Sequence, residues 1–235
     1  MRRSRLHPAD KGKVTVAGSY LDPLGMFGGA FDPVHIGHLR GAMAVREELA
    51  LKHVDLIPAA QSPLKTDAAL PSEHRLAMLR LAVNDVPGLG VDTRELERSG
   101  PSYTVDTLTA ARAEYGEARP LLWIVGSDIL ATLPQWSRWQ ELLDYAHLVV
   151  MARPGANTPD DLVTEWIAAH RIEGAQAVIQ PAGGVVLVKQ PLLDIASSQI
   201  RSLIASGGDP RFLMPDAVME YIDEHNLFSR GDACQ

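Results

Sequence analysis

Short apolar segments of strand length alternate with segments of helical spacing along most of this chain. The strand-length segments lie at residues 24–27, 54–58, 89–95, 121–126, 147–152 and 184–190. Helical patterns occupy residues 38–50, 73–83, 102–116, 197–208 and 215–226. This alternation predicts parallel strands joined by helices that cover both faces of the sheet. We therefore expect an α/β fold with a Rossmann-like, doubly wound parallel sheet, whose ligands bind beyond the carboxyl ends of the strands.

The apolar spacing also predicts the buried side and the ends of some helices. Leu76, Leu79 and Val83 share one face of the helix expected at 73–83. Gly116 is placed to end the helix at 102–116, and the helix at 197–208 begins on serine.

The composition excludes several classes of protein. The longest apolar runs, such as LLWIV and LVVMA, are too short to cross a membrane. The net charge of −7 argues against broad nucleic-acid binding, although a few local cations can still hold a small anion. The sole cysteine, Cys234, allows no internal disulfide and favours a cytoplasmic location.

The ends of the chain differ in character from its middle. Residues 1–23 read as a polar extension, partly disordered, whose basic start lacks the apolar segment of a signal peptide. Residues 24–229 are expected to form a single domain, and residues 230–235 a C-terminal tail.

One stretch, MFGGAFDPVHIGHLRGA at residues 26–42, concentrates glycines and two histidines. Gly28 and Gly29 follow a predicted strand and let the backbone turn and approach a ligand closely. A helix is expected to begin near His35, where free N–H groups and the helix dipole attract anions. His35 and His38 are three residues apart, which places both imidazoles on one helix face. Together these donors predict a polyphosphate ligand.

Other interpretations of this stretch remain open at this point. A pair of histidines on a helix is most often polar surface. A zinc pair lacks the HExxH pattern and nearby cysteines. The stretch matches neither the P-loop nor the GxGxxG dinucleotide pattern. Gly37, between the histidines, keeps the helix surface low enough for a bulky group to lie against it.

The segment GGAFDPVHIGH resembles the GGxFDPxHxGH signature of the HxGH nucleotidyltransferase superfamily, and the chain is most similar to bacterial nicotinate-nucleotide adenylyltransferases. Further segments follow in that family's order: IPAAQSPLK, HRLAMLRLA, DTRELERSGPSYTVDTL, WIVGSDILATLPQW, HLVVMARPG and IASSQIR. The first motif identifies only the superfamily, whereas PSYTVDTL with GSDILATLPQW indicates the nicotinate enzyme. The resemblance covers residues 24–228.

This resemblance implies the transfer of AMP from ATP to nicotinate mononucleotide, which gives deamido-NAD and pyrophosphate. The attack on the α-phosphorus is direct and in line, so no nucleophilic serine or cysteine is needed. His35, His38 and Arg201 are implied as catalytic residues that stabilise charge on the phosphates. Mg²⁺ is expected to arrive bound to ATP, and no metal-ligating residue is predicted. The residues implied to bind ATP are Gly28, Gly29, Ala30, Phe31, His35, His38, Gly126, Asp128, Ser198 and Arg201.

The SSQIR segment is implied to hold the β- and γ-phosphates of ATP. Ser198 lies at a helix start, and Arg201 follows three residues later on the same face. A hydroxyl, the helix amides and a guanidinium suit phosphate oxygens. The alternative is an ordinary serine-capped helix with a solvated arginine.

The acceptor is implied to bind at two other segments and a loop. Thr104 and neighbouring backbone amides would receive the nicotinate carboxylate, and Trp136 would stack on the pyridine ring. Lys65 would meet the mononucleotide phosphate, and Asp128 would bind ribose or orient a loop cation. Each has a structural alternative: Trp136 as core, Thr104 as a helix start, Lys65 as a solvated side chain. Arg153 is a weaker candidate on the nucleotide side.

Three positions depart from the family pattern. Ala30 stands where a hydroxyl is common, Leu64 where a histidine is expected, and Ala196 where the first serine of the ISxTxIR pattern would be. Ser198 takes the place of the threonine. These departures put one loop contact to phosphate in doubt but leave both histidines and Arg201.

Two other functions compete with this one. A related transferase would use nicotinamide mononucleotide or phosphopantetheine as acceptor, although PSYTVDTL and PQW argue against the pantetheine enzyme. A non-catalytic nucleotide sensor would be favoured by loss of a histidine or of Arg201, and all three are present.

Overall fold

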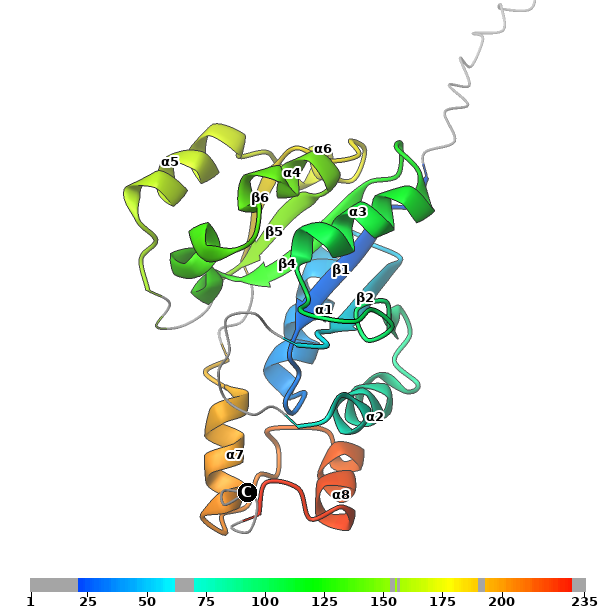
Figure 1. The fold of residues 1–235 in the computed structure, drawn as a ribbon, viewed down its shortest axis with the longest axis vertical. Helices are drawn as coiled ribbons and strands as arrows, with labels where there is room; N and C mark the ends of the chain where they lie inside the picture. The colour runs from blue at the N-terminus through cyan, green and yellow to red at the C-terminus, as the bar shows by residue number, and fades with distance from the viewer. Residues whose placement is uncertain (1–20, 62–69, 153–154, 156, 190–192, 230–235) are drawn as a thin grey trace, which may run out of the picture.

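Six parallel strands form one sheet, with helices packed around it (Figure 1). The computed structural model describes residues 21–61, 70–152, 155, 157–189 and 193–229. The strands are β1 (Leu24–Gly29), β2 (His53–Pro58), β3 (Leu89–Val91), β4 (Leu121–Gly126), β5 (His147–Met151) and β6 (Val185–Val188). Their order is β3-β2-β1-β4-β5-β6, and every pairing is parallel. The predicted doubly wound fold is confirmed, with the strand order reversing between β1 and β4.

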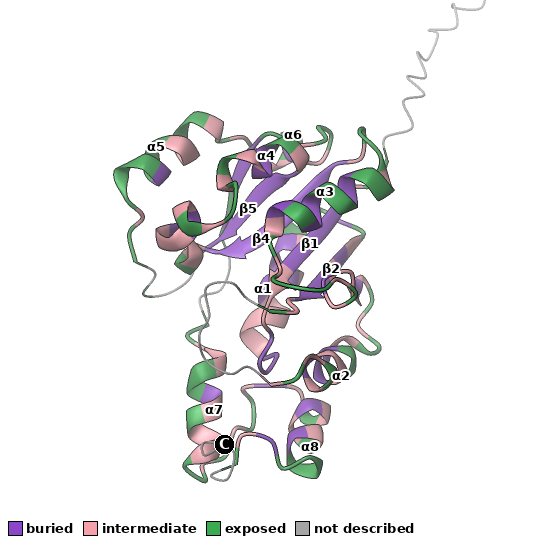
Figure 2. Cartoon of the chain, in the orientation of Figure 1, coloured by how far each residue is buried: buried purple, intermediate pink, exposed green. Residues whose placement is uncertain are grey.

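Two separate hydrophobic clusters show why both faces of the sheet are covered. Along β4, Leu122 and Ile124 pack into one cluster, whereas Trp123 and Val125 pack into the other. Successive side chains of a strand point to opposite faces, so a continuous apolar run buries both. Figure 2 shows β1, β4 and β5 buried and the outer sides of the helices exposed.

The helices divide between these two clusters. The first cluster includes buried residues of α1 (Ile36–Glu48), α2 (Ser72–Val83), α7 (Ser197–Ala205) and α8 (Asp216–Glu224). The second includes residues of α3 (Thr104–Tyr115), α4 (Leu142–Tyr145), α5 (Asp161–His170) and the 3₁₀ helix η1 (Ser127–Gln135). Two short elements, η2 (Trp139–Glu141) and α6 (Gly174–Ala177), complete the described helices.

The buried face of α2 differs from the one that the sequence predicts. Leu79 is buried as expected, but Leu76 and Val83 are only half-buried. The inward side is displaced towards Arg75 and Met78, both of them buried. The spacing rule misses this displacement because it treats an arginine as a surface residue.

Beyond the carboxyl end of β1, α7 and α8 lie apart from the sheet, as Figure 1 shows. The N–H of Ile36 donates to the carbonyl of Leu213 at 2.8 Å, and Ser197 Oγ donates to the carbonyl of Pro33 at 3.0 Å. Ser197 begins α7 as predicted, but its hydroxyl docks the helix on the loop after β1 instead of capping it. None of the described helices is long and apolar enough to cross a membrane.

Candidate active site

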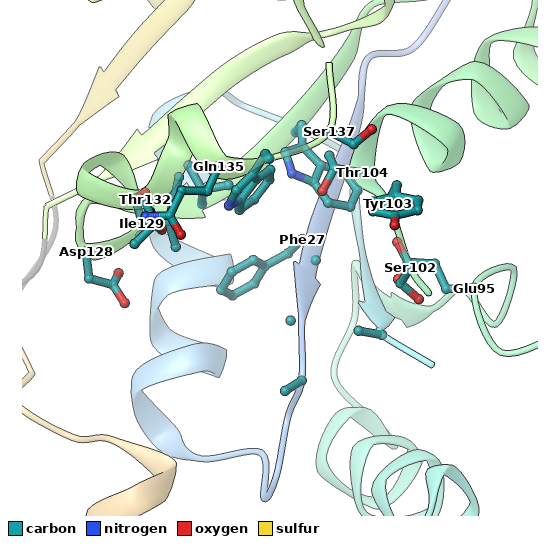
Figure 3. Close-up of a pocket in the computed structure, with 18 of the residues that line it drawn as sticks. Phe27, Glu95, Ser102, Tyr103, Thr104, Asp128, Ile129, Thr132, Gln135 and Ser137 are labelled. Atoms are coloured by element: carbon teal, nitrogen blue, oxygen red, sulfur yellow. Dashed lines mark hydrogen bonds between the residues drawn. The ribbon is translucent and has the colours of Figure 1, made fainter. Parts of the chain in front are cut away.

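A cavity of about 470 Å³ opens at the carboxyl edge of the sheet, where the strand order reverses between β1 and β4. This is where ligands bind in open α/β sheets. Figure 3 shows Asp128, Thr132 and Gln135 on one side of the cavity, and Glu95 and Ser102 on the other. The cavity is lined by eight residues that the sequence analysis assigned to substrates: Gly28, Gly29, Ala30, His38, Thr104, Gly126, Asp128 and Trp136.

The two histidines of the HxGH motif stack on each other at the start of α1. Their ring centroids are 3.6 Å apart and the rings are inclined by 25°. His35 is the N-cap residue and is only 1% exposed, whereas His38 lines the cavity. The backbone N–H of His35 donates to Nδ1 of His38 at 3.3 Å, which leaves Nε2 of His38 as the nitrogen that can donate.

Gly37 has a different role from the expected one. A Cβ at this position would lie 3.0 Å from both Cε1 and Nδ1 of the His35 ring. The space above Gly37 is thus filled by His35 and does not receive a bulky ligand group. The glycine permits the two imidazoles to stack, and the stack orients His38.

Gly28 is required by an aromatic neighbour as well as by the turn. A Cβ on Gly28 would lie 2.3 Å from Cζ2 of Trp123, which is buried and lines the cavity. The indole of Trp123 therefore lies against the bare backbone of β1. No hydrogen-bond partner of its Nε1 is found among the described residues.

Phe31 lies in the core instead of the cavity. Its side chain is buried, and its ring packs edge-on against Phe27 and His38, with centroid separations of 5.7 Å and 5.0 Å. Its φ of +50° is unusual for a residue with a Cβ. Only the backbone of Phe31 is therefore available to a nucleotide.

Arg201 and Ser198 of α7 do not line the 470 Å³ cavity. Nη1 of Arg201 donates to the carbonyl of Asp32 at 2.7 Å and lies 3.7 Å from Oδ2 of that residue. Ser198 is exposed. The structure thus brings α7 to the turn that follows β1 without placing either side chain in the cavity itself.

On the acceptor side, Thr104 is the first residue of α3, and no side chain caps this helix. Thr104 itself lines the cavity, so the helix start lies at its wall. Trp136 directly follows η1, is half-buried against the second cluster and lines the cavity. Lys65 and Arg153, which the sequence analysis also assigned, lie outside the described residues.

Glu95 lines the cavity and was not anticipated. It is 5% exposed and accepts a hydrogen bond from Thr107 Oγ1 at 2.7 Å, and it also bonds the Ser102 hydroxyl. Burial raises the pKa of this carboxyl, and the hydrogen bonds from the two hydroxyls oppose the shift. Ser102 Oγ in turn accepts from the N–H of Ala60 at 2.9 Å. The strand expected at residues 89–95 ends at Val91, and Glu95 was missed because a charged residue at the end of such a segment is interpreted as surface.

Two departures from the family pattern are accompanied by other contacts. The carbonyl of Ala30 accepts from Nη1 of Arg75 at 2.9 Å. The N–H of Ala196 donates to Oε1 of Gln199 at 2.9 Å, so α7 still has a polar contact at its start. Leu64 lies outside the described residues. Within the described part of the chain, no group of three or more His, Cys, Asp or Glu side chains is arranged to hold a metal ion.

Comparison with known proteins agrees with this geometry. The model of the family described as cytidylyltransferase-like matches residues 26–203. A curated protein of Pseudomonas putida (strain W619), named "Probable nicotinate-nucleotide adenylyltransferase", is 46% identical over 206 residues, which is 87% of this chain and 94% of that protein. The chain belongs to the nicotinate-nucleotide adenylyltransferase family. The family membership predicted from the motifs is confirmed.

One further member of the family and one solved structure extend the comparison. A protein of the same name from Aeromonas salmonicida (strain A449) is 46% identical over 209 residues, 88% of this chain and 97% of that protein. The structure of Plasmodium falciparum nicotinic acid mononucleotide adenylyltransferase complexed with NaAD has a TM-score of 0.69 at 17% identity. It covers 88% of this chain and 98% of the other. At this identity the structural likeness shows the fold alone.

Proposed function

We propose that this chain transfers AMP from Mg-ATP to nicotinate mononucleotide, giving deamido-NAD and pyrophosphate. The observation that carries the proposal is one cavity lined by His38 of the HxGH motif, by Thr104 and by Trp136. Phosphate-binding and ring-binding groups thus face a common space at the switch point of the sheet. The activity is that of the family to which the chain belongs.

The chemistry requires positioning and charge stabilisation more than a covalent intermediate. A phosphate oxygen of the mononucleotide attacks the α-phosphorus of ATP, and the bond from that phosphorus to the bridging oxygen of pyrophosphate breaks. Nε2 of His38, held by the stack with His35, donates to phosphate oxygens as charge develops. The positive end of the dipole of α1, which begins directly after His35, also favours an anion there.

The remaining ATP contacts come from the backbone and from α7. The backbone from Gly28 to Phe31 lies against the phosphates, and Gly126 and Asp128 lie beside the ribose. Arg201 reaches the outer phosphates from its place at the β1–α1 loop, with Ser198 at the start of α7. Mg²⁺ enters as part of the nucleotide substrate, bound by its phosphates.

The acceptor binds between α3 and the end of η1. Trp136 lines the cavity and stacks on the pyridine, because an aromatic side chain holds a flat base firmly. Thr104 and the first N–H groups of α3 receive the nicotinate carboxylate, because an uncapped helix start favours an anion. Lys65 meets the mononucleotide phosphate. The enzyme acts in the cytoplasm, without nucleic acid or membrane as partner.

The test is pyrophosphate release from purified protein given Mg-ATP and one acceptor at a time. We expect kcat/KM to be highest with nicotinate mononucleotide, followed by nicotinamide mononucleotide, with no release from phosphopantetheine. Faster release with either other acceptor would replace the proposed substrate. No release with any acceptor, together with tight ATP binding, would favour the nucleotide-sensing module.

A further inference from the structure

Arg75 is a buried cation that belongs to none of the substrate contacts described above. It lies on α2 in the HRLAML segment and is 2% exposed. Its nitrogens donate to four backbone carbonyls: Leu70 at 3.0 Å, Ala30 at 2.9 Å, Ala59 at 2.7 Å and Ala60 at 3.1 Å. A single planar guanidinium thus satisfies carbonyls of two loops and of Leu70, which lies two residues before the start of its own helix.

These carbonyls come from two walls of the cavity. Ala30 belongs to the turn after β1 and Ala59 to the loop after β2, and both line the cavity. Nη1 of Arg75 bonds both carbonyls at once. Nη1 of Arg75 therefore adds a second link between the phosphate-binding turn and the neighbouring wall, beside the hydrogen bond from the N–H of Ala59 to the carbonyl of Gly29 at 2.9 Å.

The wall after β2 continues to the acceptor side through Ser102. The N–H of Ala60 donates to Ser102 Oγ at 2.9 Å, and the N–H of Ser102 donates to the carbonyl of Gln61 at 2.9 Å. Ser102 lies two residues before Thr104. Hydrogen bonds thus run from the turn after β1, through Arg75 and the loop after β2, to Ser102 just before α3.

We propose that Arg75 is a positioning residue for adenylyl transfer, which fixes the phosphate-binding turn relative to the acceptor wall. This inference rests on the proposed function, because positioning matters only if two substrates must meet. In-line transfer demands close alignment of the reacting atoms, and an error of about 1 Å can cost 10²-fold in rate. A lysine would keep the charge, but its compact ammonium lacks the planar fork that lets three guanidinium nitrogens reach four carbonyls at once.

A merely structural role for Arg75 is the alternative, and the chain offers a matched control. Arg112 of α3 is 6% exposed and also donates to four backbone carbonyls, those of Tyr145, Gly116, Arg119 and Pro181. None of these residues lines the cavity. Loss of Arg112 therefore measures the cost of removing such a group without moving a cavity wall.

The experiment compares Arg75→Lys with Arg112→Lys in the full chain, at a temperature well below the Tm of both. We expect both variants to lower Tm. Arg75→Lys should lower kcat with Mg-ATP and nicotinate mononucleotide by about 10–100-fold, more than it raises either KM, whereas Arg112→Lys should stay within about threefold of wild type. Equal kcat losses in the two variants, or a loss in Arg75→Lys confined to KM, would overturn the proposal.

A second measurement applies if Arg75→Lys does not fold. Millimolar guanidinium chloride should restore kcat of Arg75→Ala in a saturable manner and should leave Arg112→Ala and wild type unchanged. Absence of rescue in folded Arg75→Ala would also overturn the proposal. If wild type used a different acceptor, the proposed function would fall, while the same comparison with that acceptor would still decide the role of Arg75.

Discussion

Arg75 and Arg112 each donate hydrogen bonds to four backbone carbonyls, but they do so at opposite edges of the sheet. Arg75 binds carbonyls in the loops that leave β1 and β2, whereas Arg112 binds carbonyls that precede β4, β5 and β6. Burial lowers the pKa of both guanidinium groups, and a nearby acidic residue opposes the shift in each case: Asp32 for Arg75 and Glu117 for Arg112. The difference between the two arginines is therefore the edge at which each lies.

The comparison shows that the two edges of a parallel sheet contribute differently to stability and to the geometry of the site. Loops at both edges carry buried carbonyls that need donors, and an arginine supplies several donors at once. At the carboxyl edge the loops also surround the cavity, so the same hydrogen bonds set the geometry of the site. We expect the amino edge to govern stability alone, and the carboxyl edge to govern stability and turnover.

The largest expected effect is on kcat, and it should distinguish a histidine at the carboxyl edge from one at the amino edge. His38→Ala should lower kcat by about 10²–10³-fold, since it removes a donor to the developing charge, with Tm close to that of wild type. His147 is fully buried at the start of β5 and faces no part of the cavity. His147→Ala should lower Tm and leave kcat unchanged below that Tm. An active His38→Ala, or a His147→Ala that is folded yet inactive, would break the comparison.

Two glycines give a smaller effect of the same kind. Gly28→Ala would place a Cβ 2.3 Å from Trp123 Cζ2, and Gly184→Ala would place one 2.2 Å from Ile172 Cδ1. Overpacking typically costs about 1–3 kcal/mol, measurable by urea unfolding. Only Gly28→Ala should also raise the KM for nicotinate mononucleotide, because Gly28 and Trp123 both line the cavity.

A double variant sharpens this prediction. Trp123→Leu removes the ring that a Cβ on Gly28 would meet, so the double variant should be less destabilised than the sum of the two single variants. Strict additivity of the two free energies of unfolding would show that the backbone at Gly28, and not the indole, determines the cost.

The smallest expected effect is a pH dependence of folding stability, caused by His147 at the amino edge. Nδ1 of His147 accepts from the N–H of Gly184 at 3.0 Å, so Nε2 carries the proton and donates to the carbonyl of Gln180 at 2.9 Å. Burial lowers the pKa of this ring from its ordinary value of 6.5. Below pH 6.5 the unfolded chain therefore binds more protons than the folded one, and stability falls as pH falls, by at most about 1.4 kcal/mol per pH unit.

The measurement is the free energy of unfolding between pH 5 and pH 7.5 for wild type and for His147→Gln. Other groups titrate in both proteins, so the difference between the two curves isolates His147. That difference should shrink as pH falls below about 6.5. A constant difference across this range would contradict a neutral, buried His147.

Much of the fold follows from local pattern, because β4 and β5 are apolar throughout and need no tertiary information to be recognised. The elements missed between β4 and β6, such as η1 with its internal Pro134 and the exposed helix α5, lack a clear period. For the site, the motifs placed His38, Thr104 and Trp136, which the structure brings to one cavity. Their roles stay predictions.

The buried charges could not be predicted in the same way. Arg75 bonds carbonyls 45 and 16 residues away in the chain, and Glu95 bonds Thr107, 12 residues away. Whether a charged residue is buried depends on partners that only the folded chain assembles. A sequence pattern contains only the residues next to such a charge, and from these alone the charged residue is predicted to lie on the surface.

The docking of α7 on the loop after β1 has a consequence for the order of synthesis. Ser197 and Pro33 are 164 residues apart, and Arg201 and Asp32 are 169 residues apart. At the ordinary speed of a ribosome, about 10–30 s separate the emergence of the two sides. A nascent chain therefore has all six strands of its sheet before α7 can dock on the loop after β1, so the contacts of Ser197 and Arg201 with that loop form after the strands have been made.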